Sequence, residues 1–194
     1  MGNFEISNDG RLTKYNGTKV TVKIPEGVKI IGAHAFEGNE TIEEVFISET
    51  VTDIEEFAFS KCKNLSKINP DGSVECNIPE NVISIGKRAF ENCRLGSVKI
   101  LGKLSCIEEG TFAYCQFYTV VIPHSVVTIA KEAFYLNRNL YIISIGSNVT
   151  IARASFSSTG VSDKFPSFYK KNEAKEGEYR VFKNKWTYGF KEIK

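Results

Sequence analysis

The sequence has little of what most metal centres and acid–base sites need. It contains two histidines, one tryptophan and one methionine in 194 residues, and it has no Cys-x-x-Cys pair. Its 25 Lys and Arg nearly balance 23 Asp and Glu, so net charge does not point to nucleic acid or to a membrane surface. No apolar run is long enough for a membrane-spanning helix, and the amino terminus lacks the basic and apolar segments of a secretory signal. These absences direct attention to architecture.

A repeat of about 22–23 residues runs through most of the chain. Each unit pairs an isoleucine with a phenylalanine twelve positions later, and the last pair is one residue shorter. Successive isoleucines lie 23, 31, 22, 22 and 23 residues apart, and the long step carries a turn-rich insertion near residues 69–76. The pairs are Ile24/Phe36, Ile47/Phe59, Ile78/Phe90, Ile100/Phe112, Ile122/Phe134 and Ile145/Phe156.

Each unit predicts two short strands and a tight turn. The residues ending at the isoleucine alternate apolar and polar, as in Val22-Lys23-Ile24, and a proline stops the strand in three units. A second isoleucine seven positions later marks another extended piece, and a small residue then precedes the phenylalanine. One unit cannot bury its own apolar side, so neighbouring units must stack into a continuous core with parallel strands about 4.8 Å apart.

A small polar or thiol side chain lies three residues after each phenylalanine and predicts a ladder that satisfies backbone groups of the turns. The column contains Asn39, Cys62, Cys93, Cys115, Asn137 and Thr159. The full pattern, V-x-I-P-x-x-V-x-x-I-G-x-x-A-F-x-x-C, resembles the BspA-like, or treponemal-type, leucine-rich repeat, most clearly in residues 22–36 and 78–93. The resemblance implies a β-rich right-handed solenoid with a parallel sheet on its concave face and short strands and turns on the convex side.

We expect one domain over residues 1–194, with a cap at 1–21, about six repeats over 22–161 and a second cap at 162–194. Residues 4–17 predict a hairpin with a turn at Asn8-Asp9-Gly10, and residues 177–190 predict another around Lys183-Asn184-Lys185. The C-terminal cap is basic, with 9 basic and 4 acidic residues over 164–194. It is either a solvated cap or a surface that contacts anions.

The candidate chemical sites are weak. Cys62, Cys93 and Cys115 share one ladder column, which predicts buried free thiols, with a Cys93–Cys115 disulfide as the alternative. His34 and His124 belong to different columns four repeats apart, so they cannot share a metal or a catalytic pair. We therefore expect no catalytic residues, no metal site and no cofactor, and we predict that the protein is not an enzyme.

The parallel strands predict a binding surface, because side chains that alternate with the core residues must face outward. This argument selects Phe46, Val121 and Ile142, which are apolar where a solvated sheet needs polar groups; ordinary surface apolarity is the alternative explanation. Tyr118 and Tyr141 lie beside them. The predicted partner-binding residues are Lys23, Phe46, Asn77, Lys99, Tyr118, Val121, Tyr141, Ile142 and Ser144.

The resemblance implies proteins that bind other macromolecules, often at a bacterial or protist surface and including host or matrix proteins. We predict a non-catalytic protein–protein interaction module that is monomeric, does not insert into membranes and does not bind nucleic acid. A carbohydrate-binding surface built on the exposed tyrosines and Asn77 is the alternative. Because members of this family are often exported, the resemblance implies an exported or surface protein, although this chain shows no signal peptide.

Overall fold

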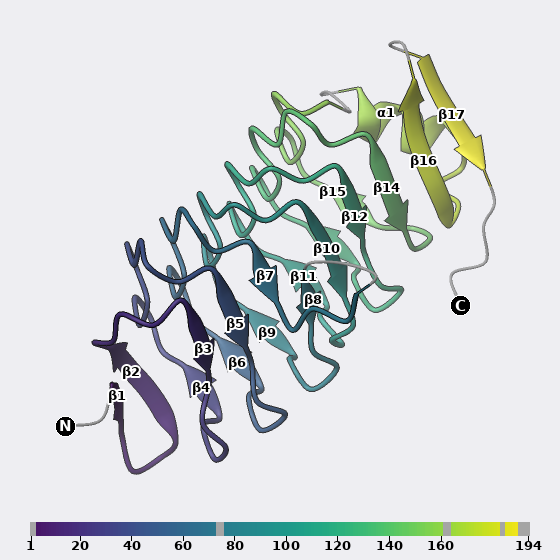
Figure 1. Cartoon of the computed structure of the whole chain (residues 1–194). Helices are drawn as coiled ribbons and strands as arrows, with labels where there is room; N and C mark the ends of the chain where they lie inside the picture. Colours follow the sequence, from purple (N-terminus) through teal and green to yellow (C-terminus); the bar gives the residue numbers. More distant parts are fainter. Residues whose placement is uncertain (1–2, 73–75, 161–163, 183–184, 190–194) are drawn as a thin grey trace.

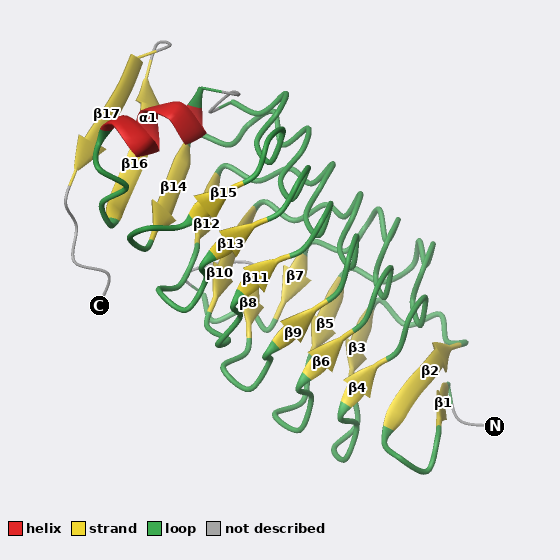
Figure 2. Cartoon of the chain, turned by 180° about the vertical axis from the view of Figure 1, so that it is seen from behind, coloured by secondary structure: helices red, strands yellow, loops and turns green. Residues whose placement is uncertain are grey.

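The structure is a computed structural model that describes residues 3–72, 76–160, 164–182 and 185–189. It is a solenoid of about six turns whose repeats stack along one axis, with the two termini at opposite ends (Figure 1). Each turn places one short strand on one side and a second short strand on the other (Figure 2). The predicted fold is confirmed.

The main sheet forms one side of the solenoid from parallel strands. Its order along the axis follows the chain, and the pairing between its two sections is a single parallel bridge, Ile68↔Cys76. The main sheet consists of β3 (Thr21–Lys23), β5 (Glu44–Phe46), β7 (Lys67–Ile68), β8 (Asn77–Ile78), β10 (Ser97–Ile100), β12 (Thr119–Val121) and β14 (Ile142–Ile145).

The other side of the solenoid has two shorter groups of parallel strands. The first follows β2 (Arg11–Tyr15) and contains β4 (Ile30–Ile31), β6 (Asp53–Ile54) and β9 (Ser84–Ile85). The second contains β11 (Cys106–Ile107), β13 (Thr128–Ile129) and β15 (Thr150–Ile151). These strands are two residues long after β2, because the chain must turn again within a few residues to complete a 22–23-residue repeat.

The long step in the repeat contains a strand, whereas the sequence indicated only a loop. Ile68 and Cys76 both fall in the inward-facing column of the main sheet, because Ile68 pairs with Val45 and bridges Cys76. The chain therefore leaves β7, returns as β8 and adds a second strand to the main sheet within a single repeat. On the other side, β6 pairs directly with β9, so no additional strand is present there.

The core is one continuous column of apolar side chains between the two sides. The six repeat phenylalanines are all buried and stack face to face, with ring centroids 4.7–5.6 Å apart. Tyr15 stacks on Phe36 at one end, and Phe165 closes the other end edge-on against Phe156. Aromatic pairs of this kind add stability beyond their buried area.

Left-handed backbone on both sides of each phenylalanine produces the tight turn around its ring. The residues two positions before and two positions after each phenylalanine have positive φ, and most of them are not glycine. For a residue with a side chain, this left-handed conformation costs about 1–2 kcal/mol. Packing of the buried ring must offset that cost. The residues are His34, Gly38, Phe57, Lys61, Arg88, Asn92, Gly110, Tyr114, Glu132, Leu136, Ala154 and Ser158.

Both caps contain the predicted hairpins. At the amino end, β1 (Phe4–Ile6) pairs antiparallel with β2, which then pairs parallel with β4. At the carboxyl end, β16 (Gly177–Phe182) extends the main sheet from β14 and pairs with β17 (Lys185–Gly189), while the turn predicted there lies partly outside the described residues. A short helix, α1 (Phe165–Lys171), buries Phe165 and Tyr169 against the last repeat and was not predicted.

Candidate binding surface

The outward side of the main sheet, called here the main face, contains most of the predicted partner-binding residues. Strand alternation places its side chains in two columns that run across neighbouring strands. The register pairs Thr119 with Ile142 and Val121 with Ser144 across β12 and β14. Because β16 pairs with β14, the cap continues this face beyond the repeats.

Two predicted contact residues are not available on this face. Asn77 is 4% exposed and Ser144 is 7% exposed, so the expectation that both side chains face solvent is wrong. Asn77 Nδ2 donates a hydrogen bond to the carbonyl oxygen of Asn69, 3.0 Å away, in the segment that returns to form β8. Ser144 lies directly beside Glu178 of β16, so the cap hairpin flanks it. Alternation along a strand predicts the direction in which a side chain points. It does not predict whether neighbouring segments bury that side chain.

Exposed or half-buried apolar residues recur on β12, on β14 and in the turns just before them. Tyr118 is 51% exposed and Tyr141 is 45% exposed, and Val121 and Ile142 beside them are half-buried. The backbone aligns the two tyrosines, because the Tyr141 amide donates to the carbonyl oxygen of Tyr118 at 3.1 Å. These four residues on β12, β14 and the turns before them are called here the tyrosine patch.

Phe46 does not join this patch. It lies on β5, and β7, β8 and β10 separate it from β12. Lys23 of the neighbouring strand β3 places its Nζ 5.6 Å from the centre of the Phe46 ring, a cation–π contact that partly covers the aromatic side chain. Lys99 is half-buried on β10, between the two apolar regions. The predicted strip is therefore two separate regions.

The cysteine column is a hydrogen-bonding ladder. Cys62, Cys93 and Cys115 are free and buried, and each Sγ donates to the carbonyl oxygen of the phenylalanine one repeat earlier, at 3.1–3.2 Å. Burial raises the pKa of Cys62 and of Cys115 to about 12, and it raises the pKa of Cys93 as well. Thiols with such pKa values hold little reactive thiolate at neutral pH, which supports a structural role.

The histidines lie apart, as their columns indicated. His34 Nδ1 lies 2.6 Å from Glu37 Oε2 and its ring stacks on Phe57, whereas His124 Nε2 lies 3.2 Å from Glu176. Within the described part of the chain, no three His, Cys, Asp or Glu side chains are grouped so that they could hold a metal ion. The same residues include no helix with the length and hydrophobicity needed to cross a bilayer.

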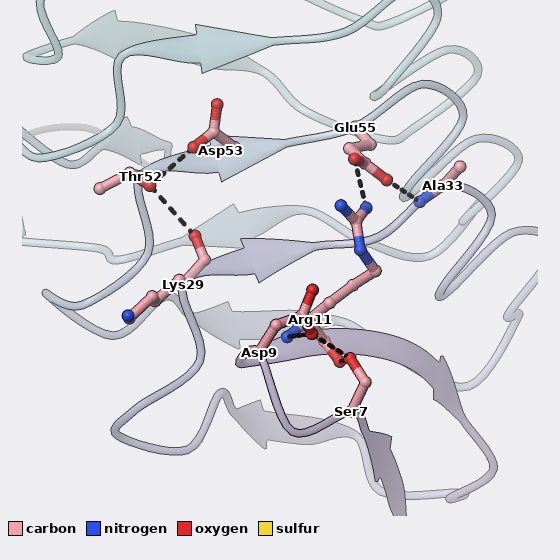
Figure 3. Close-up of polar contacts among 8 residues, drawn as sticks. All are labelled: Ser7, Asp9, Arg11, Lys29, Ala33, Thr52, Asp53 and Glu55. Atoms are coloured by element: carbon pink, nitrogen blue, oxygen red, sulfur yellow. Dashed lines mark hydrogen bonds and ion pairs between the residues drawn. The ribbon is translucent and has the colours of Figure 1, made fainter.

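Polar contacts on the side opposite the main face fasten the N-terminal cap (Figure 3). Arg11 forms an ion pair with Glu55, which also accepts a hydrogen bond from the Ala33 amide at 2.9 Å. Hydrogen bonding to Glu55 raises the pKa of Arg11 above its ordinary value. Ser7 and Asp9 close the hairpin turn beside it. This cluster joins the cap to the second repeat and has the character of a structural contact.

Comparison with known proteins agrees with the repeat pattern and with the fold. The model of the BspA type leucine-rich repeat region matches residues 14–76 and 73–185, with six copies. The chain belongs to this family. No curated protein matches the chain significantly.

Two crystal structures of leucine-rich repeat proteins share the fold with this BspA-type chain. One, from Eubacterium ventriosum, is 21% identical over 81% of this chain with a TM-score of 0.63, and the chain spans only 50% of its length. The other, the leucine-rich repeat protein TpLRR of T. pallidum, is 24% identical over 88% of this chain, with a TM-score of 0.57 and 90% of its own length covered. The BspA-type repeat suggests a module for protein interaction or surface binding, and such solenoids are typically not enzymes.

Sequence reasoning missed a hollow beside the additional strand of this BspA-type solenoid. It has a volume of about 520 Å³, and residues from three successive repeats line it. The one available signal was the cluster of Asn, Asp and Pro between Ile68 and Asn81, which indicated a turn and concealed a strand. The lining residues are Glu49, Asn69, Asp71, Asn77, Pro79, Glu80, Asn81 and Leu101.

Proposed function

We propose that this chain binds a protein partner through the tyrosine patch and has no catalytic role. The observation that carries the proposal is the pair of half-exposed tyrosines in adjacent repeats, next to the partly exposed Val121 and Ile142. The buried columns explain why inward residues are apolar, but they give no reason for apolar residues on the outward side of β12 and β14. A binding partner supplies one.

The composition of the patch fits a protein interface better than a plain surface. Tyrosine is enriched at the centres of interfaces, where an aromatic body buries area and its hydroxyl keeps a polar contact. A small number of such residues usually supplies most of the binding energy. Lys99 on β10 and Arg180 on β16 flank the patch on either side and supply charges for a polar rim.

A carbohydrate-binding surface has weaker support. That alternative relied on the tyrosines together with Asn77, but Asn77 is 4% exposed and lies on β8, which β10 separates from β12. The proposal therefore favours a protein, with an adhesin-like role at a cell surface as its biological form. Export and surface location are part of the proposal and rest on the family alone.

The test uses a double variant, Val121→Asp with Ile142→Asp, on a panel of immobilised matrix proteins and on a glycan array. We expect the wild type to bind a protein, and the double variant to lose most of that binding without an appreciable change in melting temperature, because both side chains lie on the outward side. The matched control is Ile83→Asp with Val127→Asp, since these residues are 56% and 58% exposed and lie away from the patch. Binding by the control variant remains intact.

Two results would contradict the proposal. Binding to glycans alone favours the carbohydrate alternative. Protein binding that survives the double variant, and that charge reversal at Lys170 and Lys171 removes, places the site on the basic cap. Charge reversal is preferable to deletion of residues 164–194, because Phe165, Tyr169 and Tyr179 of the cap are buried against the last repeat and their loss exposes the core.

A further inference from the structure

The hollow beside the additional strand is lined by hydrogen-bond acceptors. It lies where the chain leaves β5 and β8, and its lining residues include three carboxylates, Glu49, Asp71 and Glu80. Three asparagines, Asn69, Asn77 and Asn81, complete its polar wall, and no Lys, Arg or His is among its described lining residues. Carboxylates next to amides suit several ligands, so the direction in which the amides point decides the chemistry.

All three asparagines donate hydrogen bonds from their side-chain NH2 groups to backbone carbonyl oxygens. Asn69 Nδ2 donates to the carbonyl oxygen of Ile47 at 3.1 Å, and Asn77 Nδ2 donates to that of Asn69 at 3.0 Å. Asn81 Nδ2 donates to the carbonyl oxygen of Val51. A carbonyl oxygen only accepts hydrogen bonds, so none of these amides can be turned around without placing two acceptors together.

Within the described residues, one buried acceptor beside the hollow lacks a donor. Asn77 is 4% exposed, and its Oδ1 has no hydrogen-bond partner among the residues that the structure describes. Asn69 Oδ1, by contrast, accepts from the Ile47 amide at 2.6 Å. A buried acceptor without a donor is energetically unfavourable, and most such groups in folded proteins are satisfied. A ligand that brings a donor into the hollow removes this deficit.

The walls of the hollow also fit a side chain with an apolar stem. Leu101 is 37% exposed, and Pro79 lies half-buried beside it, so both offer apolar surface next to the carboxylates. Arginine and lysine carry a charged donor group at the end of a chain of methylene groups, and they bury that chain along apolar surface. Arginine has several N–H donors in a planar group, which suits a wall of separate acceptors.

We propose that this hollow binds an arginine or lysine side chain of a protein partner. The inference rests on the proposed function in one respect, since it takes the cation to belong to a protein ligand. It adds a second contact on a different part of the solenoid and defines a chemical class for the partner, a segment with an accessible basic residue. The carboxylates of Glu49 and Glu80 pair with the charge, and Asn77 Oδ1 accepts one of its N–H groups.

The test is an NMR titration of the full chain with a blocked pentapeptide that has one arginine between glycines. We expect saturable shifts of the side-chain amide signals of Asn77 and Asn81. The same peptide with citrulline, which has the shape of arginine without its charge, binds about tenfold more weakly or less. Glu49→Gln with Glu80→Gln weakens the arginine peptide by a similar factor. Both residues are exposed, so we expect the double variant to fold normally.

The matched control is Glu26→Gln with Glu43→Gln, which removes two exposed carboxylates outside the hollow. Equal weakening by this control shows a general charge effect and overturns the proposal. Equal binding of the citrulline peptide, shifts produced by neutral monosaccharides in place of the peptide, or the absence of any saturable shift overturns it too. Val121→Asp with Ile142→Asp leaves peptide binding unchanged, so failure of the tyrosine patch and failure of the hollow give different results.

Discussion

The N-terminal and C-terminal parts of the main face share one core and differ in what they present outward. In the N-terminal part, β3, β5 and β7, outward side chains contact one another across repeats: Thr21 bonds to Glu44 at 3.2 Å, and Lys23 covers Phe46. In the C-terminal part, β10, β12 and β14, Val121 and Ile142 lie beside two exposed tyrosines. Stacking constrains the inward columns equally in both parts and leaves the outward columns free to acquire a function.

The largest expected effect concerns the core that both parts share. Phe90→Ala removes a fully buried ring from the middle of the aromatic column and destabilises the fold by about 3–5 kcal/mol through lost burial and the remaining cavity. Phe46→Ala costs about 1 kcal/mol, because it removes a half-buried outward ring and one cation–π contact. Denaturant unfolding followed by circular dichroism measures both. Equal losses of stability would mean that the outward assignment of Phe46 is wrong.

A smaller loss of stability is expected from substitutions in the hydrogen-bonding ladder, which can be compared between one position in each part. Asn137 in the C-terminal part donates to the carbonyl oxygens of Phe112 and Phe134, at 2.8 and 2.9 Å, and accepts from the Phe117 amide at 3.2 Å. Asn137→Ala leaves these buried groups without partners and costs about 2–3 kcal/mol.

Cys62 in the N-terminal part makes one weak Sγ bond, so Cys62→Ala is the matched comparison in the same column. We expect it to cost about 1 kcal/mol less than Asn137→Ala. The same unfolding experiment compares the two variants. A greater loss for Cys62→Ala would show that side-chain packing, and not hydrogen bonding, dominates this column.

The smallest expected effect is a pH dependence located in the N-terminal part. Hydrogen bonds from His34 and Lys61 hold the pKa of Glu37 below its ordinary value of 4.5. Because the folded pKa is the lower one, the stabilisation is present above pH 4.5 and is lost as the pH falls through the folded value.

Glu37→Gln should therefore flatten the dependence of unfolding free energy on pH in that acidic range, as measured by denaturant unfolding at several pH values. Glu26→Gln serves as the control in the same part of the chain. If Glu37→Gln leaves the acid limb of the curve unchanged, the contact between Glu37, His34 and Lys61 contributes nothing measurable to folding.

The inward columns could be predicted from sequence because their chemistry allows few alternatives. A buried ring next to a small residue recurs in every repeat, and this recurrence alone placed Phe36 through Phe156 in the core. The additional strand could not be predicted in this way. It is two residues long, Cys76 is not typical of its column, and its asparagines and prolines indicate a turn.

The outward residues depend on information that a single strand does not contain. Alternation selected Val121 and Ile142 as outward residues, and both are half-buried. Ser144 is 7% exposed, because the cap hairpin continues the sheet beside it. Asn77 is covered because a neighbouring segment takes its amide. The acceptor character of the hollow depends on the directions of hydrogen bonds, which only the folded backbone specifies.

The additional strand resembles an edge dislocation in a crystal, where an extra row ends inside an otherwise regular lattice. The main side gains one strand spacing, about 4.8 Å, while the aromatic column continues with Phe59 and Phe90 only 5.3 Å apart. Removal of residues 69–76 shortens the step from 31 to 23 residues, which is the ordinary period, and joins Ile68 to Asn77-Ile78-Pro79 in the pattern of the first repeat. The additional strand and the hollow beside it therefore form one unit, and we expect its removal to leave the core on both sides in phase.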